Sequence, residues 1–203
     1  NAVAVMVNGR PLYNPRSELS YNNENVWHYN RIAKGHVHTI DINHYELPTP
    51  ESIGATEWNT TEHSPIIGWA FDGLPIYGPY GYTELAANGD IVDSAITNIK
   101  SSFKIKTGLR ESGPGGAFTG SFVEDYDWDS ALSSAPGYAN KFNMRYGKTP
   151  ESPTNAIRYY VATIDDSGTP MFPYAVGGDT TTVGTNSVTW ANKYYQAGPN
   201  VNG

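Results

Sequence analysis

Residues 63–81 read HSPIIGWAFDGLPIYGPYG and hold the densest structural signal in this sequence of 203 residues. Residues 66–71 are almost entirely apolar, which favours a mostly buried strand. Three turn-forming pairs follow, namely Asp72-Gly73, Gly78-Pro79 and Tyr80-Gly81. The stretch therefore predicts short extended segments separated by tight turns.

Further strands are predicted on both sides of this stretch. Residues 2–7 form an apolar, β-branched run that ends at Asn8-Gly9, a pair that indicates a hairpin turn. Residues 102–107 alternate between polar and apolar side chains, as a strand with one wet face does. Residues 157–164 give the strongest strand pattern of the second half.

Helical patterns are short and weak. Residues 83–88 fit one or two helical turns closed by Gly89, and residues 129–132 fit the start of a helix. We therefore predict one mainly β domain over residues 1–177, a sandwich or barrel-like arrangement of short antiparallel strands with long loops and at most one or two short helices. Residues 178–203 are rich in Thr, Gly and Asn and are interpreted as a C-terminal tail or linker.

Composition excludes several classes of site and partner. The chain has 20 acidic and 13 basic residues and a net charge of −7, which argues against nucleic acid as a partner. No apolar run approaches the roughly 18 residues of a membrane span, so we expect no membrane insertion. The absence of cysteine excludes disulfides, thiolate metal sites and cysteine nucleophiles.

Residues 63–81 closely resemble the signature of the YHYH domain family. The signature positions that match are His63, Pro65, Gly68, Asp72, Gly73, Pro75, Tyr77, Gly78, Pro79 and Gly81. Further similar blocks occur in the same order along the chain, among them residues 8–15, 20–27, 122–126, 148–153 and 160–165. The name-giving Tyr-His-Tyr-His is absent, and Gly35-His36-Val37-His38 and Asn43-His44-Tyr45 stand in its place.

The resemblance also implies a biological context. Copies with the Phe-Val-Glu-Asp-Tyr and Thr-Pro-Glu blocks are similar to those in long virion structural proteins of marine cyanobacterial phages, and other members resemble secreted or surface proteins of bacteria. We therefore expect a non-enzymatic structural or adhesive module of an appendage such as a phage tail fibre, located outside the cell, on its surface or in a virion. Expected partners are further copies in a homo-oligomer or fibre, other appendage subunits, or a cell-surface glycan.

The histidines suggest an alternative function. All five lie between His28 and His63. On a strand, His36 and His38 would share one face and could chelate zinc or copper, with His63, His44 or Asp72 as a further ligand. A metal-binding enzyme or metal-handling protein is thus the alternative hypothesis. In the competing interpretation, His36 and His38 are polar residues on a solvated strand face, and His63 holds a turn by hydrogen bonding.

Three further groups have both a functional and a structural interpretation. Asp72 fits a general base, but its neighbour Gly73 favours a side chain that caps the turn. Trp58, Tyr82 and Tyr45 are candidates for stacking on glycan rings, whereas core packing is the common use of such residues. The acidic run at residues 124–129 resembles the start of a calcium loop, yet Ser130 replaces the glycine that loop requires, so we interpret the run as a solvated loop.

Overall fold

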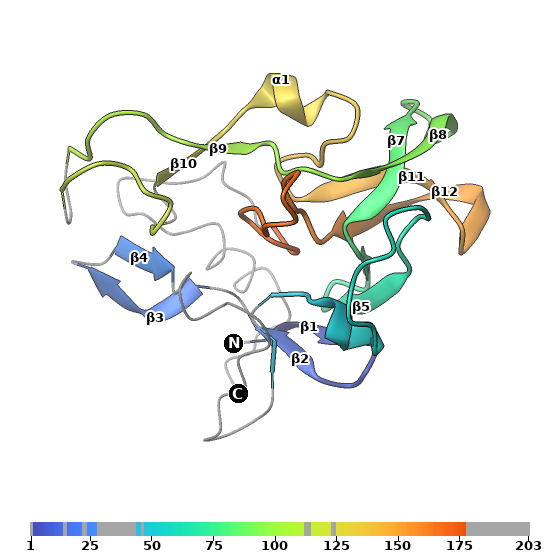
Figure 1. Ribbon diagram of the computed structural model, residues 1–203, viewed down its shortest axis with the longest axis horizontal. Helices are drawn as coiled ribbons and strands as arrows, with labels where there is room; N and C mark the ends of the chain where they lie inside the picture. The colour runs from blue at the N-terminus through green and yellow to red at the C-terminus, as the bar shows by residue number, and fades with distance from the viewer. Residues whose placement is uncertain are drawn as a thin grey trace.

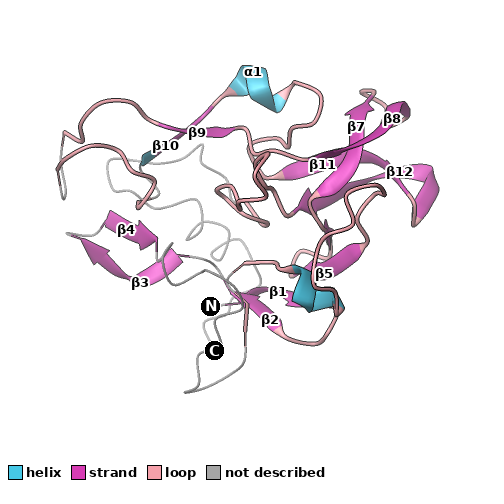
Figure 2. Cartoon of the chain, in the orientation of Figure 1, coloured by secondary structure: helices cyan, strands magenta, loops and turns pink. Residues whose placement is uncertain are grey.

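The computed structural model describes residues 2–13, 16–21, 24–27, 44–45, 47–111, 115–122 and 125–177, with the backbone alone for 16–21 and 24–27. Strands and loops make up nearly all of it (Figure 2), which confirms the mainly β prediction. Its helical elements are single turns, η2 (Pro50–Ile53) and α1 (Ser130–Ser133). Among the described residues, no helix is long and apolar enough to cross a membrane.

The largest sheet of the fold has six strands, and Figure 1 labels β1, β2, β5, β11 and β12 among them. Its strand order is β11-β12-β6-β5-β1-β2, and every neighbouring pair is antiparallel except β12 and β6. The strands are β1 (Ala2–Met6), β2 (Pro11–Tyr13), β5 (Ile66–Ala70), β6 (Pro75–Tyr77), β11 (Met144–Thr149) and β12 (Ser152–Val161). The sheet therefore joins the signature, in β5 and β6, to the N-terminal strands β1 and β2 and to the later strands β11 and β12.

The predicted hairpin at the N-terminus is confirmed. β1 pairs with β2, and the Gly9 amide donates to the Met6 carbonyl at 2.8 Å in the turn between them. Gly9 has a φ of 82°, a conformation that glycine adopts without a Cβ clash.

Three two-stranded sheets accompany the six-stranded sheet among the described residues. They are β3 (Arg16–Tyr21) with β4 (Glu24–Trp27), β7 (Tyr80–Leu85) with β8 (Ile91–Asn98), and β9 (Phe103–Ile105) with β10 (Tyr126–Trp128). The β7–β8 hairpin lies over β11 and β12 (Figure 1), where the Lys148 amide donates to the Gly89 carbonyl at 2.9 Å. A buried cluster of Tyr77, Ile99, Ala139, Tyr159 and Val161 fills the space between them.

The helical prediction for residues 83–88 was wrong. This segment ends strand β7, which pairs with β8 over most of its length, and Gly89 closes the β7–β8 turn with a φ of 84°. Cross-strand pairing and packing on β11 outweigh a weak local helix propensity. The helix start at residue 129 is confirmed, because the Asp129 carboxylate accepts the Ala131 and Leu132 amides at 2.9 and 3.1 Å.

The signature strand β5 is only half buried. Ile67, Gly68 and Ala70 are buried, but Trp69 is 49 % exposed and Phe71, just after the strand, is 56 % exposed. The sequence predicts a mostly buried strand for this run, and these two aromatic residues depart from that prediction. Val5, which stands opposite Trp69 on β1, is 42 % exposed as well, so the described elements leave this face of the two strands uncovered.

Candidate functional site

The signature brings His63 into a cluster of tyrosine rings. Its ring centroid lies 5.2 Å from that of Tyr77, 5.0 Å from that of Tyr82 and 6.3 Å from that of Tyr159. The rings of Tyr77 and Tyr159 meet edge to face at 5.0 Å. Because β6 and β12 are parallel neighbours with Val161 opposite Tyr77, Tyr159 reaches the same face of the sheet as Tyr77.

The protonation of His63 follows from its contacts. Its Nδ1 lies 2.8 Å from the carbonyl oxygen of Ser64, which can only accept, so Nδ1 carries the proton. The other nitrogen, Nε2, is buried and has no hydrogen-bond partner among the described residues. Burial lowers the pKa of His63 below its ordinary value, so the ring is held neutral.

Two of the polar side chains around this ring, Tyr77 and Arg145, bond within the fold, whereas the buried Tyr159 hydroxyl has no hydrogen-bond partner among the described residues. The Tyr77 hydroxyl donates to Glu151 Oε2 at 3.0 Å and lies 2.9 Å from Thr149 Oγ1, and burial raises the pKa of Tyr77. Burial also raises the pKa of Tyr159 and lowers that of Arg145. The Arg145 guanidinium, which is buried beside Tyr159, donates to the backbone carbonyls of residues 82 and 83.

The His63-Ser64 pair is not arranged as a base and a nucleophile. The ring nitrogen of His63 binds the backbone carbonyl of Ser64, while the Ser64 hydroxyl oxygen accepts the Tyr80 amide at 3.0 Å. Gly78 packs so closely on this serine that an added Cβ would lie 2.8 Å from the Ser64 Cβ. These contacts hold the β5–β6–β7 turns together, which is the structural role that the sequence offered for His63.

Asp72 also bonds at both carboxylate oxygens. One oxygen accepts the Leu74 amide at 3.0 Å within the turn, and the other accepts the Tyr160 hydroxyl at 2.8 Å. Gly73 has a φ of 85°, as the predicted turn requires. The geometry favours the turn-capping interpretation over that of a general base.

The predicted metal ligands are only partly described. His36 and His38 lie outside the described residues. His44 stacks on Tyr13 with ring centroids 4.1 Å apart, away from the tyrosine cluster that holds His63. Within the described part of the chain, no three His, Asp or Glu side chains are grouped as metal ligands, so the zinc or copper site stays a prediction.

The predicted glycan-stacking residues lie mostly inside the fold. Tyr45 is only 5 % exposed, and Trp58 packs against the same core cluster. Tyr82 is partly buried beside His63. The more exposed aromatic side chains are Trp69, Phe71, Trp128 and Tyr146.

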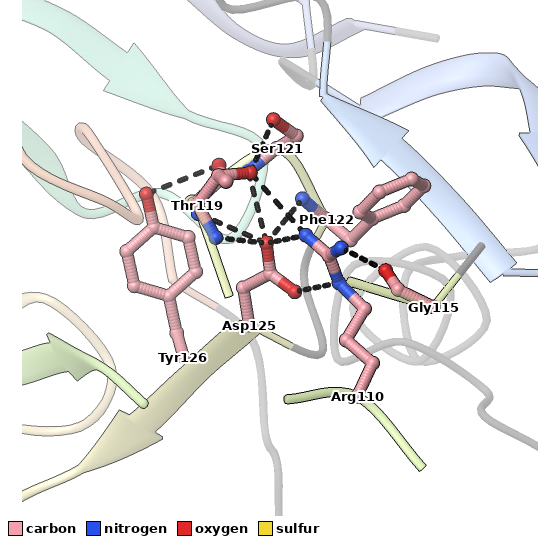
Figure 3. A network of polar contacts seen from close by, with 8 residues as sticks. Arg110, Gly115, Thr119, Ser121, Phe122, Asp125 and Tyr126 are labelled. Atoms are coloured by element: carbon pink, nitrogen blue, oxygen red, sulfur yellow. Dashed lines mark hydrogen bonds and ion pairs between the residues drawn. The ribbon is translucent and has the colours of Figure 1, made fainter. Parts of the chain in front are cut away.

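A second polar network is centred on Asp125, which the sequence placed in a solvated loop (Figure 3). That placement was wrong, because Asp125 is 0 % exposed. The Arg110 Nε and Nη2 atoms donate to its two oxygens at 2.7 Å each. The amides of Thr119, Gly120, Ser121 and Phe122 donate to Oδ2 at 2.9–3.4 Å.

This network shapes the loop between β9 and β10. Burial alone would raise the pKa of Asp125, but Arg110 and the backbone amides outweigh it and leave the pKa below its ordinary value. The neighbouring acids have separate partners: Asp127 lies 3.6 Å from the Lys106 ammonium and Asp129 lies 2.6 Å from that of Lys104. The described acids of this run, Asp125, Asp127 and Asp129, therefore contribute to the structure of the loop, and Glu124 lies outside the described residues.

Comparison with protein-family models identifies residues 1–175 with the family described as YHYH protein. The chain belongs to the YHYH family. No curated protein and no solved structure matches it. The YHYH resemblance that residues 63–81 carry is thus confirmed and extends over nearly the whole described chain.

Sequence reasoning missed the residues that complete both networks. Arg145 and Tyr159 reach His63 from strands far along the chain, and Arg110 reaches Asp125 across the loop. The one signal that pointed toward Glu151 was the Thr-Pro-Glu block shared with YHYH proteins. No local pattern indicates which distant arginine meets a buried carboxylate.

Proposed function

We propose that this YHYH protein is a non-enzymatic structural or adhesive module of an extracellular or virion appendage, and that it assembles through copies of itself. The observation that carries the proposal is a contrast within the signature between polar groups that bond inside the fold and aromatic side chains that are exposed. The Nδ1 atom of His63, the Asp72 carboxylate and the Tyr77 hydroxyl bond inside the fold, whereas Trp69 and Phe71 are exposed. The resemblance of its sequence blocks to virion and bacterial surface proteins supports a location outside the cell, on its surface or in a virion.

One exposed apolar surface lies on β1 and β5 and just beyond their ends. Val5 stands opposite Trp69 in the antiparallel register, so both side chains share one face of the sheet. Val5 is 42 % and Val7 51 % exposed, and Phe71 lies two residues beyond Trp69. We name Val5, Val7, Trp69 and Phe71 the β1–β5 patch.

A second copy of the chain is the proposed occupant of the β1–β5 patch. Gathered apolar side chains on a soluble protein mark contact surfaces, and one such surface can meet its own copy about a two-fold axis. Aromatic residues at the centre of such a contact commonly contribute about 2 kcal/mol or more each. The patch could thus supply much of the free energy of self-association.

Sedimentation and light scattering over a range of concentrations test this proposal. We expect the wild-type chain to form a dimer or larger assembly, and Trp69→Ser to weaken self-association at least tenfold, as loss of about 1.4 kcal/mol or more would. Leu109→Ser is the matched control, because Leu109 is 71 % exposed but lies in the loop between β9 and β10, outside the β1–β5 patch. A wild-type chain that stays monomeric throughout, or an equal effect of Leu109→Ser, would contradict the proposal.

A further inference from the structure

A polar hollow of about 240 Å³ lies between β7, β11 and the segment that follows α1. It is separate from the β1–β5 patch and borders the buried Arg145. Among the residues that line it are Glu84, Ser133, Ser134, Tyr138, Asn140 and Tyr146. Its wall thus combines a carboxylate, hydroxyls, an amide and aromatic rings.

One residue of the β11 edge remains open at this hollow. The Val161 amide of β12 donates to the carbonyl of Asn143, the residue just before β11. Because hydrogen-bonded positions alternate along an antiparallel pair, the odd-numbered residues of β11 bond to β12, and the backbone groups of the even-numbered residues point away from β12. Met144 exchanges outward bonds with Asn140 at 2.9 and 3.0 Å, and the Lys148 amide bonds Gly89.

Between these two bonded positions lies Tyr146. No described residue bonds to its outward N–H and C=O groups. Its side chain is 46 % exposed, which leaves part of the ring accessible. The strand edge therefore presents one donor and one acceptor next to an accessible aromatic ring.

We propose that this hollow binds a single neutral saccharide ring. Sugar hydroxyls donate and accept at once, so they suit a site that offers the Tyr146 backbone pair, the Glu84 carboxylate and serine hydroxyls. The apolar face of a sugar suits the exposed Tyr146 ring. The volume is smaller than the roughly 300–1,000 Å³ of sites for larger ligands, as one ring requires.

Two other ligand classes fit less well. A peptide strand needs several consecutive free backbone groups, but β11 is already bonded at Met144 and Lys148 on either side of Tyr146. An anion would approach the Glu84 carboxylate on a chain whose net charge is −7, and the Arg145 guanidinium, which also lines the hollow, already donates to the carbonyls of residues 82 and 83. A neutral polyhydroxyl ligand meets neither obstacle.

The inference rests on the adhesive half of the proposed function and gives it a ligand class. Titration of ¹⁵N-labelled protein with the methyl glycosides of glucose, galactose, mannose and N-acetylglucosamine tests it, with sodium sulfate as the anionic probe. We expect at least one glycoside to shift the Tyr146 backbone amide saturably, with a millimolar Kd. Sulfate should leave that amide unchanged.

Two variants locate the site. Glu84→Gln keeps the size of an exposed side chain and should weaken binding at least fivefold, while Tyr146→Ala should abolish it. Trp128→Ala is the control, because Trp128 is 41 % exposed and does not line the hollow. Dispersed amide spectra establish that each variant is folded.

The inference is overturned if no glycoside shifts the Tyr146 amide, if sulfate alone does so, or if only Trp128→Ala impairs binding. None of these results touches self-association, which the Trp69→Ser variant reports separately. A chain that assembles through the β1–β5 patch but binds no glycoside therefore refutes the saccharide site alone.

Discussion

Replacement of Asp125 by asparagine is expected to destabilise the protein strongly. Asp125→Asn preserves the shape of the side chain but removes its charge and turns one acceptor oxygen into a donor NH₂ group. One of the two oxygens receives Arg110 Nε, and the other receives Arg110 Nη2 together with four backbone amides. Whichever oxygen is replaced, a buried donor then faces other donors.

The magnitude follows from the burial of Arg110. Loss of one partner of a buried ion pair costs about 3–5 kcal/mol, because the other charge stays buried without compensation. The Arg110 side chain is only 11 % exposed, but it keeps its bonds to the Gly115 carbonyl at 2.6 Å and the Thr119 hydroxyl at 3.2 Å. We therefore expect a loss near the lower end, about 3 kcal/mol, a large part of a typical domain stability of about 5–15 kcal/mol.

Urea denaturation followed by tryptophan fluorescence measures this loss, since the chain has 5 tryptophans. Asp127→Asn is the control: Asp127 is 73 % exposed and lies 3.6 Å from Lys106, so its loss should cost less than about 1 kcal/mol. Equal effects of the two variants would refute the assignment of Asp125 as the buried centre of the loop.

The pH dependence provides a second check on Asp125. Its pKa in the folded state is lowered from 3.8, so its stabilising effect is complete above the unfolded pKa and disappears as the pH falls through the folded value. The gap in unfolding free energy between wild type and Asp125→Asn should therefore be constant near neutral pH and narrow in strong acid. A gap that widens on acidification would contradict the lowered pKa.

Two further predictions concern the tyrosine cluster. Because burial lowers the folded pKa of His63 below 6.5, the unfolded chain binds more protons as the pH falls below about 6.5, so the unfolding free energy should decrease there. His63→Gln should flatten this dependence, and an unchanged slope in His63→Gln would contradict it. Tyr77→Phe removes the hydroxyl that bonds Thr149 and Glu151 and should cost about 1–2 kcal/mol in urea denaturation, whereas Tyr146→Phe, at an exposed position, should change stability by less than about 0.5 kcal/mol.

Local patterns predicted the elements that depend on neighbouring residues. The hairpin at Asn8-Gly9 and the helix cap at Asp129 were confirmed, because backbone conformation at a turn or cap is set within a few residues. The turn at Asp72-Gly73 belongs to the same class. These features need no knowledge of the rest of the fold.

Sequence patterns were less informative about burial and strand pairing, because these depend on which other elements pack against a segment. The apolar run at residues 66–71 was expected to be mostly buried, yet Trp69 and Phe71 are exposed because no described element covers that face of β5. Residues 83–88 were expected to be helical, yet pairing with β8 makes them part of a strand and turn. Local propensities of about 1 kcal/mol or less are readily outweighed by such tertiary contacts.

The amino-acid sequence alone thus determined the mainly β class and the turns, because these follow from residue types and short spacings, and its resemblance to the YHYH signature determined the family. Only the tertiary structure decided that His63 meets Tyr159, that Arg110 meets Asp125 and that Tyr146 opens onto a polar hollow. Those contacts join residues from different strands and loops, and the energy that selects them comes from burial and charge pairing across the assembled sheet.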